Sequence, residues 1–269
     1  MSIHPTAVIE TGARLGKSVV VGPFAFIAGD SDIGDGCVIG PQVVVHAYTR
    51  IGAGTRVHAG AVLGDVPQDV AFKPGTASRV DIGADCTIRE GVTIHRGTKP
   101  DTATVVGDGC FLMANSHLGH NVRLGHHVIL ANGALLAGYV EVGDRAFVSG
   151  NAAIHQFVRI GRLAMTSGCS VITKDLPPFC TARGASLNCV AGLNVVGMRR
   201  AGMSPQDRQD VRRAFKVIYR SGLNVSQAVE RLRGEFPDGP VREFREFIEA
   251  SKRGICAFGG GRDDERQGE

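Results

Sequence analysis

The sequence predicts a parallel β-helix followed by a small α-helical domain. Three observations predict it: an aliphatic residue recurs every six positions between residues 3 and 172, glycine is unusually abundant at 37 residues, and an amphipathic helical pattern begins only after the repeat ends. A spacing of six fits neither one face of a helix nor a simple alternating strand. Short strands joined by regular turns, with the aliphatic side chains stacked inward, explain it best.

The six-residue repeat runs in two blocks. The first starts at Ile3 and continues without a miss to Leu63, and the second runs from Ile82 to Ile172. Of the 27 positions, only Pro100 and Thr166 are not aliphatic. The pattern is similar to that of the left-handed hexapeptide-repeat acyltransferases, and this resemblance implies a left-handed helix with triangular coils of 18 residues.

Two segments interrupt the repeat. Residues 64–81 and 95–105 are rich in Pro, Gly, Thr and Asp, and they therefore predict loops that leave the coils. Loops on a rigid scaffold often carry binding or catalytic residues.

The β-helix is expected to span residues 1–176, because Pro177 and Pro178 cannot donate to a further ladder. A helical domain is expected over residues 177–256. Ser204 before Pro205 is a typical helix start, Asn224 opens a second amphipathic run, and a third run contains Phe244. Residues 257–269 predict a disordered tail.

Composition excludes several classes of protein. The apolar fraction of 43% is sufficient for a core, and the absence of tryptophan with only 6% aromatics indicates a core of aliphatic residues. The net charge of +4 is small, and the basic residues do not form an aromatic-lined groove, so we expect no nucleic-acid partner.

The seven cysteines have no C-x-x-C spacing, so we expect reduced, mostly buried thiols rather than a zinc site or a dithiol centre. No segment resembles a secretion signal, and none is long and apolar enough for a membrane span. We therefore expect a cytoplasmic protein without stable membrane insertion.

The stretch ANSHLGHN, residues 114–121, places His117 and His120 around the stacked Leu118. If a coil has 18 residues, Gly138 lies directly above His120, and Gln156 lies above Gly138, with roughly 4.8 Å between coils. A base, an open backbone N–H and an amide then line one cleft. Acyl transfer needs such a base for the nucleophile's proton and such a donor for the developing oxyanion.

A closer resemblance covers nearly the whole chain. The segments NSHLGHN, ILANGALLAGYVEVGD, AAIHQFVRIG, REGVTIHRGT, DLPPF and NVVGMRRAG are similar to those of the acyl-carrier-protein-dependent UDP-N-acetylglucosamine acyltransferases, the enzymes of the first step of lipid A synthesis. The resemblance implies transfer of a (R)-3-hydroxyacyl chain from acyl carrier protein to the 3-position of the UDP-sugar. It also implies a homotrimer with the cleft between subunits, no metal, and no cofactor apart from the phosphopantetheine that enters on the carrier.

The resemblance also assigns roles to individual residues. His120 matches the general base and Gly138 the oxyanion donor. Residues that match substrate-binding positions, or lie beside them, are His117, Asp69, Lys73, Tyr139, His155, Gln156, Asn194, Arg199 and Arg200. Gly168 matches the region that sets acyl chain length, and Met165 and Leu187 are expected to line the same acyl-chain pocket. Basic residues at Arg199, Arg200, Arg212, Arg213, Lys216 and Arg220 are expected to meet the acidic carrier.

Five positions depart from the family pattern. Asn121 stands where an aspartate usually follows the base, and an amide cannot stabilise an imidazolium as a carboxylate does. Tyr139 replaces a sugar-contacting histidine, Ala71 replaces a lysine, and Val196 and Ala201 replace polar or basic residues. These departures lead to the hypothesis of an acceptor with a 3-amine, which is a better nucleophile than a hydroxyl.

Two other enzyme classes share parts of this pattern. The UDP-3-O-acylglucosamine N-acyltransferase of the same pathway has a similar H-x-x-H-N sequence, but it carries an extra N-terminal domain, whereas the repeat here begins at Ile3. A hexapeptide carbonic anhydrase would need three histidines that converge on zinc, and nine histidines are available. A purely structural β-helix or binding module is the third alternative.

Overall fold

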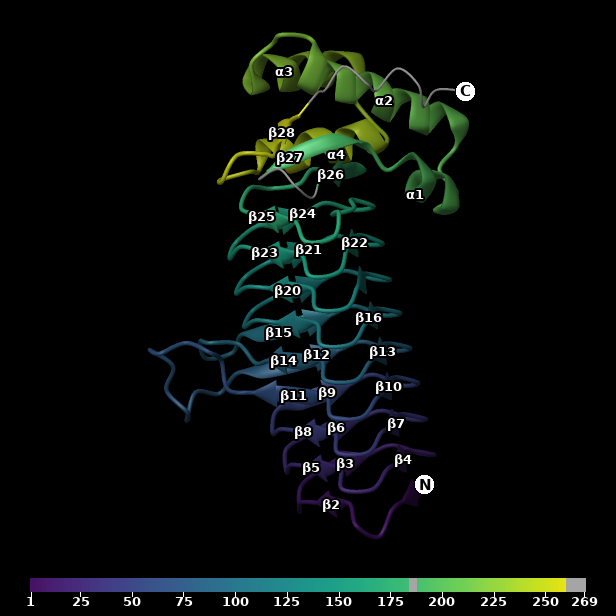
Figure 1. The fold of residues 1–269 in the computed structure, drawn as a ribbon, viewed down its shortest axis with the longest axis vertical. Coiled ribbons are helices and arrows are strands. Elements are labelled where there is room, and N and C mark those ends of the chain that lie inside the picture. The colour runs from purple at the N-terminus through teal and green to yellow at the C-terminus, as the bar shows by residue number, and fades with distance from the viewer. Residues whose placement is uncertain (184–187, 260–269) are drawn as a thin grey trace.

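The computed structural model describes residues 1–183 and 188–259. Most of this chain is a left-handed parallel β-helix, in which three sheets form the faces of a prism (Figure 1). Each strand pairs in parallel with the strands of the coils below and above, as Ser2 with Val20 in the first pair. The predicted fold class is confirmed.

The first two faces are sheets A and B. Sheet A contains β1 Ser2–Ile3, β4 Val20–Val21, β7 Val38–Ile39, β10 Arg56–Val57, β13 Thr87–Ile88, β16 Phe111–Leu112, β19 Ile129–Leu130 and β22 Phe147–Val148. Sheet B contains β2 Val8–Ile9, β5 Phe26–Ile27, β8 Val44–Val45, β11 Val62–Asp65, β14 Thr93–His95, β17 His117–Leu118, β20 Leu135–Leu136, β23 Ala153–Ile154 and β25 Val171–Ile172.

The third face is sheet C. It contains β3 Arg14–Leu15, β6 Asp32–Ile33, β9 Thr49–Ile51, β12 Arg79–Ile82, β15 Ala103–Val106, β18 Arg123–Leu124, β21 Glu141–Val142 and β24 Arg159–Ile160. In most of these strands the second residue is the stacked aliphatic of the repeat. Leu112, Leu118, Leu130 and Leu136 are fully buried, so the axis of the prism is a continuous apolar column.

Both predicted insertions occur, but they are shorter than the sequence indicated. Of the two predicted segments, only residues 66–78 and 96–102 leave the prism. The insertions are shorter than predicted because the flanking strands are longer than two residues: β11, β12 and β15 have four residues, and β14 has three. The longer insertion projects from the prism near its middle (Figure 1).

Pairing continues past the predicted end of the β-helix. Met165 N–H donates to Cys180 O at 2.9 Å, and Met165 bridges to Thr181 beyond the two prolines. A small sheet then follows, with β26 Cys180–Ala182, β27 Cys189–Leu193 and β28 Ala257–Phe258. The sequence predicted no strands after residue 177, and it placed Ala257–Phe258 in a disordered tail, whereas these residues pair with β27. Residues 260–269 of that tail lie outside the described residues.

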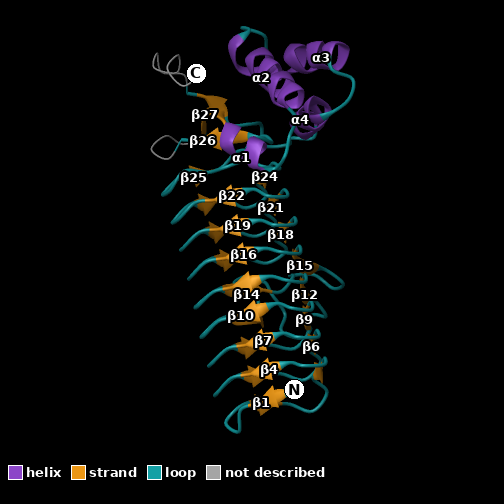
Figure 2. Cartoon of the chain, turned by 90° about the vertical axis from the view of Figure 1, so that its right-hand side faces the viewer, coloured by secondary structure: helices purple, strands orange, loops and turns teal. Residues whose placement is uncertain are grey.

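In the described part of the chain, four helices cover the end of the prism: α1 Val195–Arg200, α2 Pro205–Arg220, α3 Val225–Glu235 and α4 Pro240–Glu249 (Figure 2). The predicted helix starts are confirmed, because Ser204 Oγ accepts a hydrogen bond from Asp207 N–H and Asn224 forms a reciprocal cap with Gln227. No helix in the described residues combines the length and apolar character that crossing a bilayer needs.

Candidate active site

His120, Gly138 and Gln156 occupy three stacked turns where the chain passes from sheet B to sheet C. We call the turns at residues 119–121, 137–139 and 155–157 the His120 corner. Tyr139 N–H donates to His120 O at 3.0 Å, and Phe157 N–H donates to Gly138 O at 3.1 Å. The stacking predicted from an 18-residue coil is therefore confirmed at this corner.

A cleft of about 400 Å³ opens beside these turns on the face of sheet B. Its lining brings together four of the predicted site residues, His117, His120, Gly138 and Gln156. The other lining residues are Gln68, His95, Gly119, Leu135, Leu136, Ala137, Ala153 and Ile154. The cleft thus has an aliphatic floor and an imidazole-rich end.

The His120 ring lies directly against Gly138. A Cβ atom at position 138 would lie 2.4 Å from His120 Cε1 and 2.5 Å from Nε2, so only glycine leaves room for the imidazole. In the described part of the chain, no group accepts a hydrogen bond from Gly138 N–H. An open donor therefore lies beside the ring.

Asn121 determines which nitrogen of His120 carries the proton. Asn121 Oδ1 accepts hydrogen bonds from Thr98 N–H and from Thr98 Oγ1, both at 3.0 Å, and it lies 3.1 Å from His120 Nδ1. Because a backbone N–H can only donate, the atom facing it is the amide oxygen. His120 Nδ1 must then be the donor, and in the neutral ring the lone pair is on Nε2.

Tyr139 packs beside the His120 ring. Its ring meets the His120 ring edge to face at 5.2 Å and stacks on Phe157 at 5.0 Å. The Tyr139 hydroxyl lies 3.1 Å from Thr98 Oγ1, so Thr98 joins Tyr139 to Asn121. The ring therefore restricts how His120 can move.

His117 and His95 form an imidazole pair in the cleft. Their rings meet edge to face at 4.9 Å, and His117 Nδ1 lies 2.7 Å from Thr93 Oγ1. Burial is the main cause that lowers the pKa of His117 to about 4, and the nearby His95 contributes to the same shift. Burial also lowers the pKa of His95, and both rings are therefore neutral near pH 7.

Several residues at this site were not predicted from the sequence. His95 is only 7% exposed, and its Nδ1 has no hydrogen-bond partner among the described residues, although it lines the cleft. Gln68 and Thr98 come from the two insertions. The spacing of 24 residues from Ile94 to Leu118, one coil plus six residues, is the signal that would have placed His95 beneath this cleft.

Other predicted substrate residues do not line the cleft. Asp69 and Lys73 lie on the 66–78 insertion, where Asp69 Oδ1 accepts a hydrogen bond from Ala71 N–H. His155 is exposed, and its Nδ1 lies 3.3 Å from Arg253. Tyr139 lies at the rim of a neighbouring groove.

The predicted residues of the helical region lie beyond the last coil (Figure 1). Asn194 is the N-cap of α1: its Oδ1 accepts from Gly197 N–H at 2.9 Å, and its Nδ2 donates to Leu163 O at 2.8 Å. Its side chain is therefore engaged in holding α1 to the prism. Arg199 and Arg200 are exposed on the same helix.

Met165 and Gly168, the two predicted acyl-chain residues that lie within the described part of the chain, are not in the cleft of sheet B. Met165 bridges to Phe147 of sheet A, and Gly168 is exposed, so neither lines the cleft of sheet B. Leu187 lies outside the described residues. A Cβ at Gly168 would make only ordinary contact, 3.5 Å from Gly150 O.

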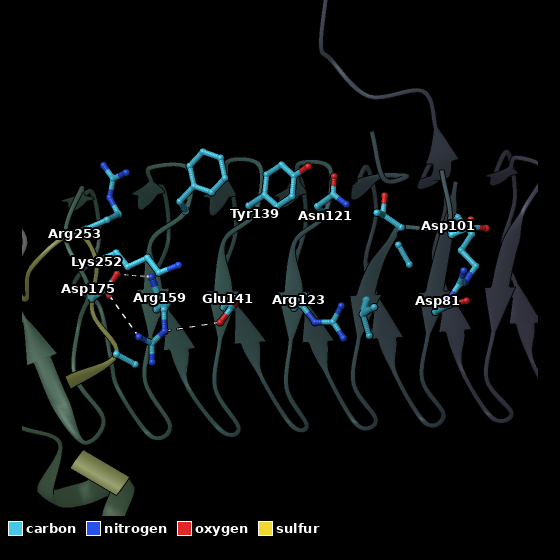
Figure 3. A pocket seen from close by; sticks show the side chains of 16 residues that line it. Asp81, Asp101, Asn121, Arg123, Tyr139, Glu141, Arg159, Asp175, Lys252 and Arg253 are labelled. Carbon is cyan, nitrogen blue, oxygen red and sulfur yellow. Dashed lines mark hydrogen bonds and ion pairs between the residues drawn. The ribbon is translucent and has the colours of Figure 1, made fainter. Parts of the chain in front are cut away.

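A second, larger groove of about 1180 Å³ runs along sheet C beside the His120 corner (Figure 3). Its floor carries opposite charges in register: Arg159 lies 3.8 Å from both Glu141 and Asp175. Asn121 and Tyr139 lie along its rim, so they separate this charged groove from the imidazoles of the cleft.

Comparison with known proteins decides the family. A model described as UDP N-acetylglucosamine O-acyltransferase, domain 2, matches residues 175–256, and a bacterial transferase hexapeptide model matches residues 30–65 and 103–138. The acyl-[acyl-carrier-protein]–UDP-N-acetylglucosamine O-acyltransferase of Campylobacter concisus is 40% identical over 94% of this chain and 97% of its own length. The chain belongs to the UDP-N-acetylglucosamine O-acyltransferase family.

Solved structures agree with this assignment. The UDP-N-acetylglucosamine acyltransferase of Bacteroides fragilis is 37% identical, with a TM-score of 0.90 over 94% of this chain and 99% of that one. The Campylobacter jejuni protein is 40% identical, with a TM-score of 0.89 over 95% and 99%. Membership of the O-acyltransferase family makes the chain an acyltransferase. It therefore favours this class over the N-acyltransferase, the carbonic anhydrase and the structural β-helix.

Proposed function

We propose that this acyltransferase moves a (R)-3-hydroxyacyl chain from acyl carrier protein to the 3-position of UDP-N-acetylglucosamine or its 3-amino analogue, in lipid A biosynthesis. The names of its relatives support the carrier and the sugar nucleotide. The observation that carries the mechanism is the His120 imidazole, held through Nδ1 by Asn121 and placed against the open Gly138 N–H.

His120 acts as the general base. Its Nε2 removes the proton from the 3-hydroxyl or 3-amino group while that group attacks the thioester carbonyl carbon. The carbonyl oxygen becomes an oxyanion, which accepts a hydrogen bond from Gly138 N–H. When the oxyanion collapses, the carbon–sulfur bond breaks, and the pantetheine thiolate takes the proton from His120. No covalent enzyme intermediate and no resident metal or cofactor is needed.

The 3-amino acceptor is supported by the surroundings of His120. Asn121 orients the ring, but its neutral amide gives the imidazolium less stabilisation than a carboxylate would. Tyr139 packs against the ring where the family usually has a histidine, and its hydroxyl is already engaged with Thr98. An amine depends less on the base than a hydroxyl does.

Turnover of both UDP sugars, side by side, with a panel of 3-hydroxyacyl carrier thioesters tests the reaction, donor and acceptor together. We expect acyl transfer by wild type with the 3-amino sugar preferred, and a loss of about 10²–10⁴-fold in His120→Ala. Clear preference for the 3-hydroxyl sugar would reject the 3-amino assignment. An unaffected His120→Ala with both sugars would reject the general base.

We also propose that the carrier docks on the basic surface of α1 and α2. Arg208, Arg212, Arg213 and Lys216 line a hollow on α2, and Arg199 and Arg200 extend the positive charge onto α1. Arg213 stacks on Phe236 and pairs with Asp210, so the guanidinium is pre-positioned. We expect added salt to raise KM for the acyl carrier and to leave KM for the UDP sugar nearly unchanged.

The proposed active form is a cytoplasmic homotrimer with the cleft between subunits. In a trimer, residues that do not line the cleft of their own chain can contact the cleft of a neighbouring copy. These residues are Arg199, Arg200, Met165 and Gly168. Light scattering of active protein tests this, and a fully active monomer would reject it. Metal analysis of the same sample tests the expected absence of a metal.

A further inference from the structure

The 66–78 insertion needs a separate means of support. It leaves sheet B after β11 and returns to sheet C at β12, and it contains no helix or strand. It brings Gln68 to the cleft and carries Asp69 and Lys73. A loop of this length without secondary structure loses much conformational entropy when it is ordered, so specific contacts must hold it.

Arg96 makes those contacts from the other insertion. Its side chain donates from NH2 to Pro74 O at 3.0 Å and from NH1 to Thr76 O at 3.2 Å. Its backbone N–H donates to Asp65 O at 3.0 Å. One residue thus binds the loop where it begins and near where it ends.

The guanidinium of Arg96 is also placed between two aromatic rings. It lies 5.6 Å from the centre of the Tyr48 ring and 5.3 Å from that of Phe72. Only 7% of Arg96 is exposed, and no carboxylate in the described residues lies within ion-pair distance. Burial of a cation without a counter-ion costs free energy, and loop carbonyls and ring faces offset this cost.

The contact with Phe72 connects Arg96 to Asp69. Phe72 N–H donates to Asp69 O, and Ala71 N–H donates to Asp69 Oδ1, both at 2.9 Å. These bonds close one tight turn, with the Asp69 carboxylate at its start and the Phe72 ring at its end. When Arg96 fixes Phe72, it also fixes the orientation of Asp69.

We propose that Arg96 is a positioning residue for the sugar-nucleotide acceptor, holding the 66–78 loop in its binding conformation before the acceptor arrives. This inference rests on the proposed function for the identity of the acceptor. Preorganisation lowers the entropy lost on binding, and it therefore acts on affinity for the acceptor rather than on the chemical step. The proposal therefore expects KM for the acyl donor to be insensitive to this loop.

Arg96→Ala and Arg96→Lys test the proposal, with Arg89→Ala as the matched control. Arg89 is a partly exposed arginine that forms an ion pair with Glu90, with 40% of its side chain exposed. In Arg96→Ala we expect KM for the UDP sugar to rise about tenfold or more, with kcat and KM for the acyl carrier nearly unchanged. Arg96→Lys keeps the charge but not the planar fork, so we expect an intermediate KM and an intact fold.

Cleavage by chymotrypsin after Phe72 gives a second readout that does not depend on activity. We expect faster cleavage in both Arg96 variants than in wild type and Arg89→Ala, and slower cleavage when UDP-N-acetylglucosamine is added. Equal rises in both KM values, a fall in kcat alone, or unchanged cleavage in Arg96→Lys would overturn the proposal. If wild type transfers no acyl group to any UDP sugar, the proposed function fails, while the cleavage rates still decide the role of Arg96.

Discussion

Two corners of the same prism differ in how their turn amides are covered. At the turns 107–109, 125–127 and 143–145, which we call the Asp144 corner, side chains cover the turn amides: His126 N–H donates to Asp144 Oδ1 at 2.8 Å, and Asp108 N–H donates to His126 Nδ1 at 3.0 Å. At the His120 corner, no side chain of the described residues accepts a hydrogen bond from Gly138 N–H, and this N–H stays open beside the His120 imidazole. The two corners have the same kind of turn, and they differ in whether a side chain accepts a hydrogen bond from the turn amide.

Among the variants that test the difference between the two corners, we expect Gly138→Ala to have the largest effect. The new Cβ would overlap the His120 ring, so the ring must move away from the open N–H. We expect kcat to fall by about 10²–10³-fold. Gly234→Ala is the control, because a Cβ there meets no atom within 4 Å, and this helical change should leave turnover intact. Full activity in Gly138→Ala would show that the ring and the amide need not lie together.

Asn121→Asp makes the His120 corner more like the family's usual pattern. The carboxylate would keep the contacts to Thr98 and His120 and would stabilise the imidazolium formed during transfer. We expect kcat with the 3-hydroxyl sugar to rise about tenfold, with a smaller rise for the 3-amino sugar. An equal rise for both sugars in the same assay would contradict the idea that Asn121 matches an amine acceptor.

The neutral imidazoles of the cleft predict a pH dependence of stability. The pKa of His117 is about 4 in the folded protein, below the usual value near ~6.5, so the unfolded chain binds the proton first as the pH falls. The free energy of unfolding should therefore decrease from about pH 6.5 to pH 4 and be insensitive to this group above pH 7. Because His117 is only partly buried, we expect His117→Gln to remove on the order of 1–2 kcal/mol of that decrease in urea titrations. An unchanged slope in the variant would contradict the burial argument.

Asp144→Ala should have the smallest effect. It uncovers the His126 amide at the Asp144 corner, and we expect a loss of about 1 kcal/mol in the free energy of unfolding. Turnover should equal that of wild type, since this corner lies on the opposite edge of sheet C. A marked loss of kcat at normal stability would show that the two corners are not independent.

Local periodicity explains what could be predicted. Each aliphatic residue of the repeat faces the axis, so the coils and the stacking of His120 under Gly138 followed from counting. The β26–β27–β28 sheet was missed because it joins Cys189 to Ala257, and no pattern in sequence marks so distant a pair. Thr98 was missed for the same reason, since it meets Asn121 only through an insertion.

The sequence shows that Asn121 and Tyr139 depart from the family pattern, but it does not show where their side chains lie. Only the structure shows that both side chains contact Thr98, and that Arg96 donates hydrogen bonds to the 66–78 insertion. Insertions break the repeat, and with it the register that made prediction possible elsewhere. Apart from His95, which lies on β14, the site residues that escaped prediction are accordingly those that insertions supply or bring into contact.

In a stacked coil, each layer contacts only the layers next to it, and this has an evolutionary consequence for the two insertions. Duplication of a coil lengthens the prism. A change in residues 66–78 or 96–102 instead alters the lateral surface of the prism and leaves the apolar column unchanged. Lineages of this fold can therefore diversify in substrate by rewriting loops, while selection on the column continues to preserve stability.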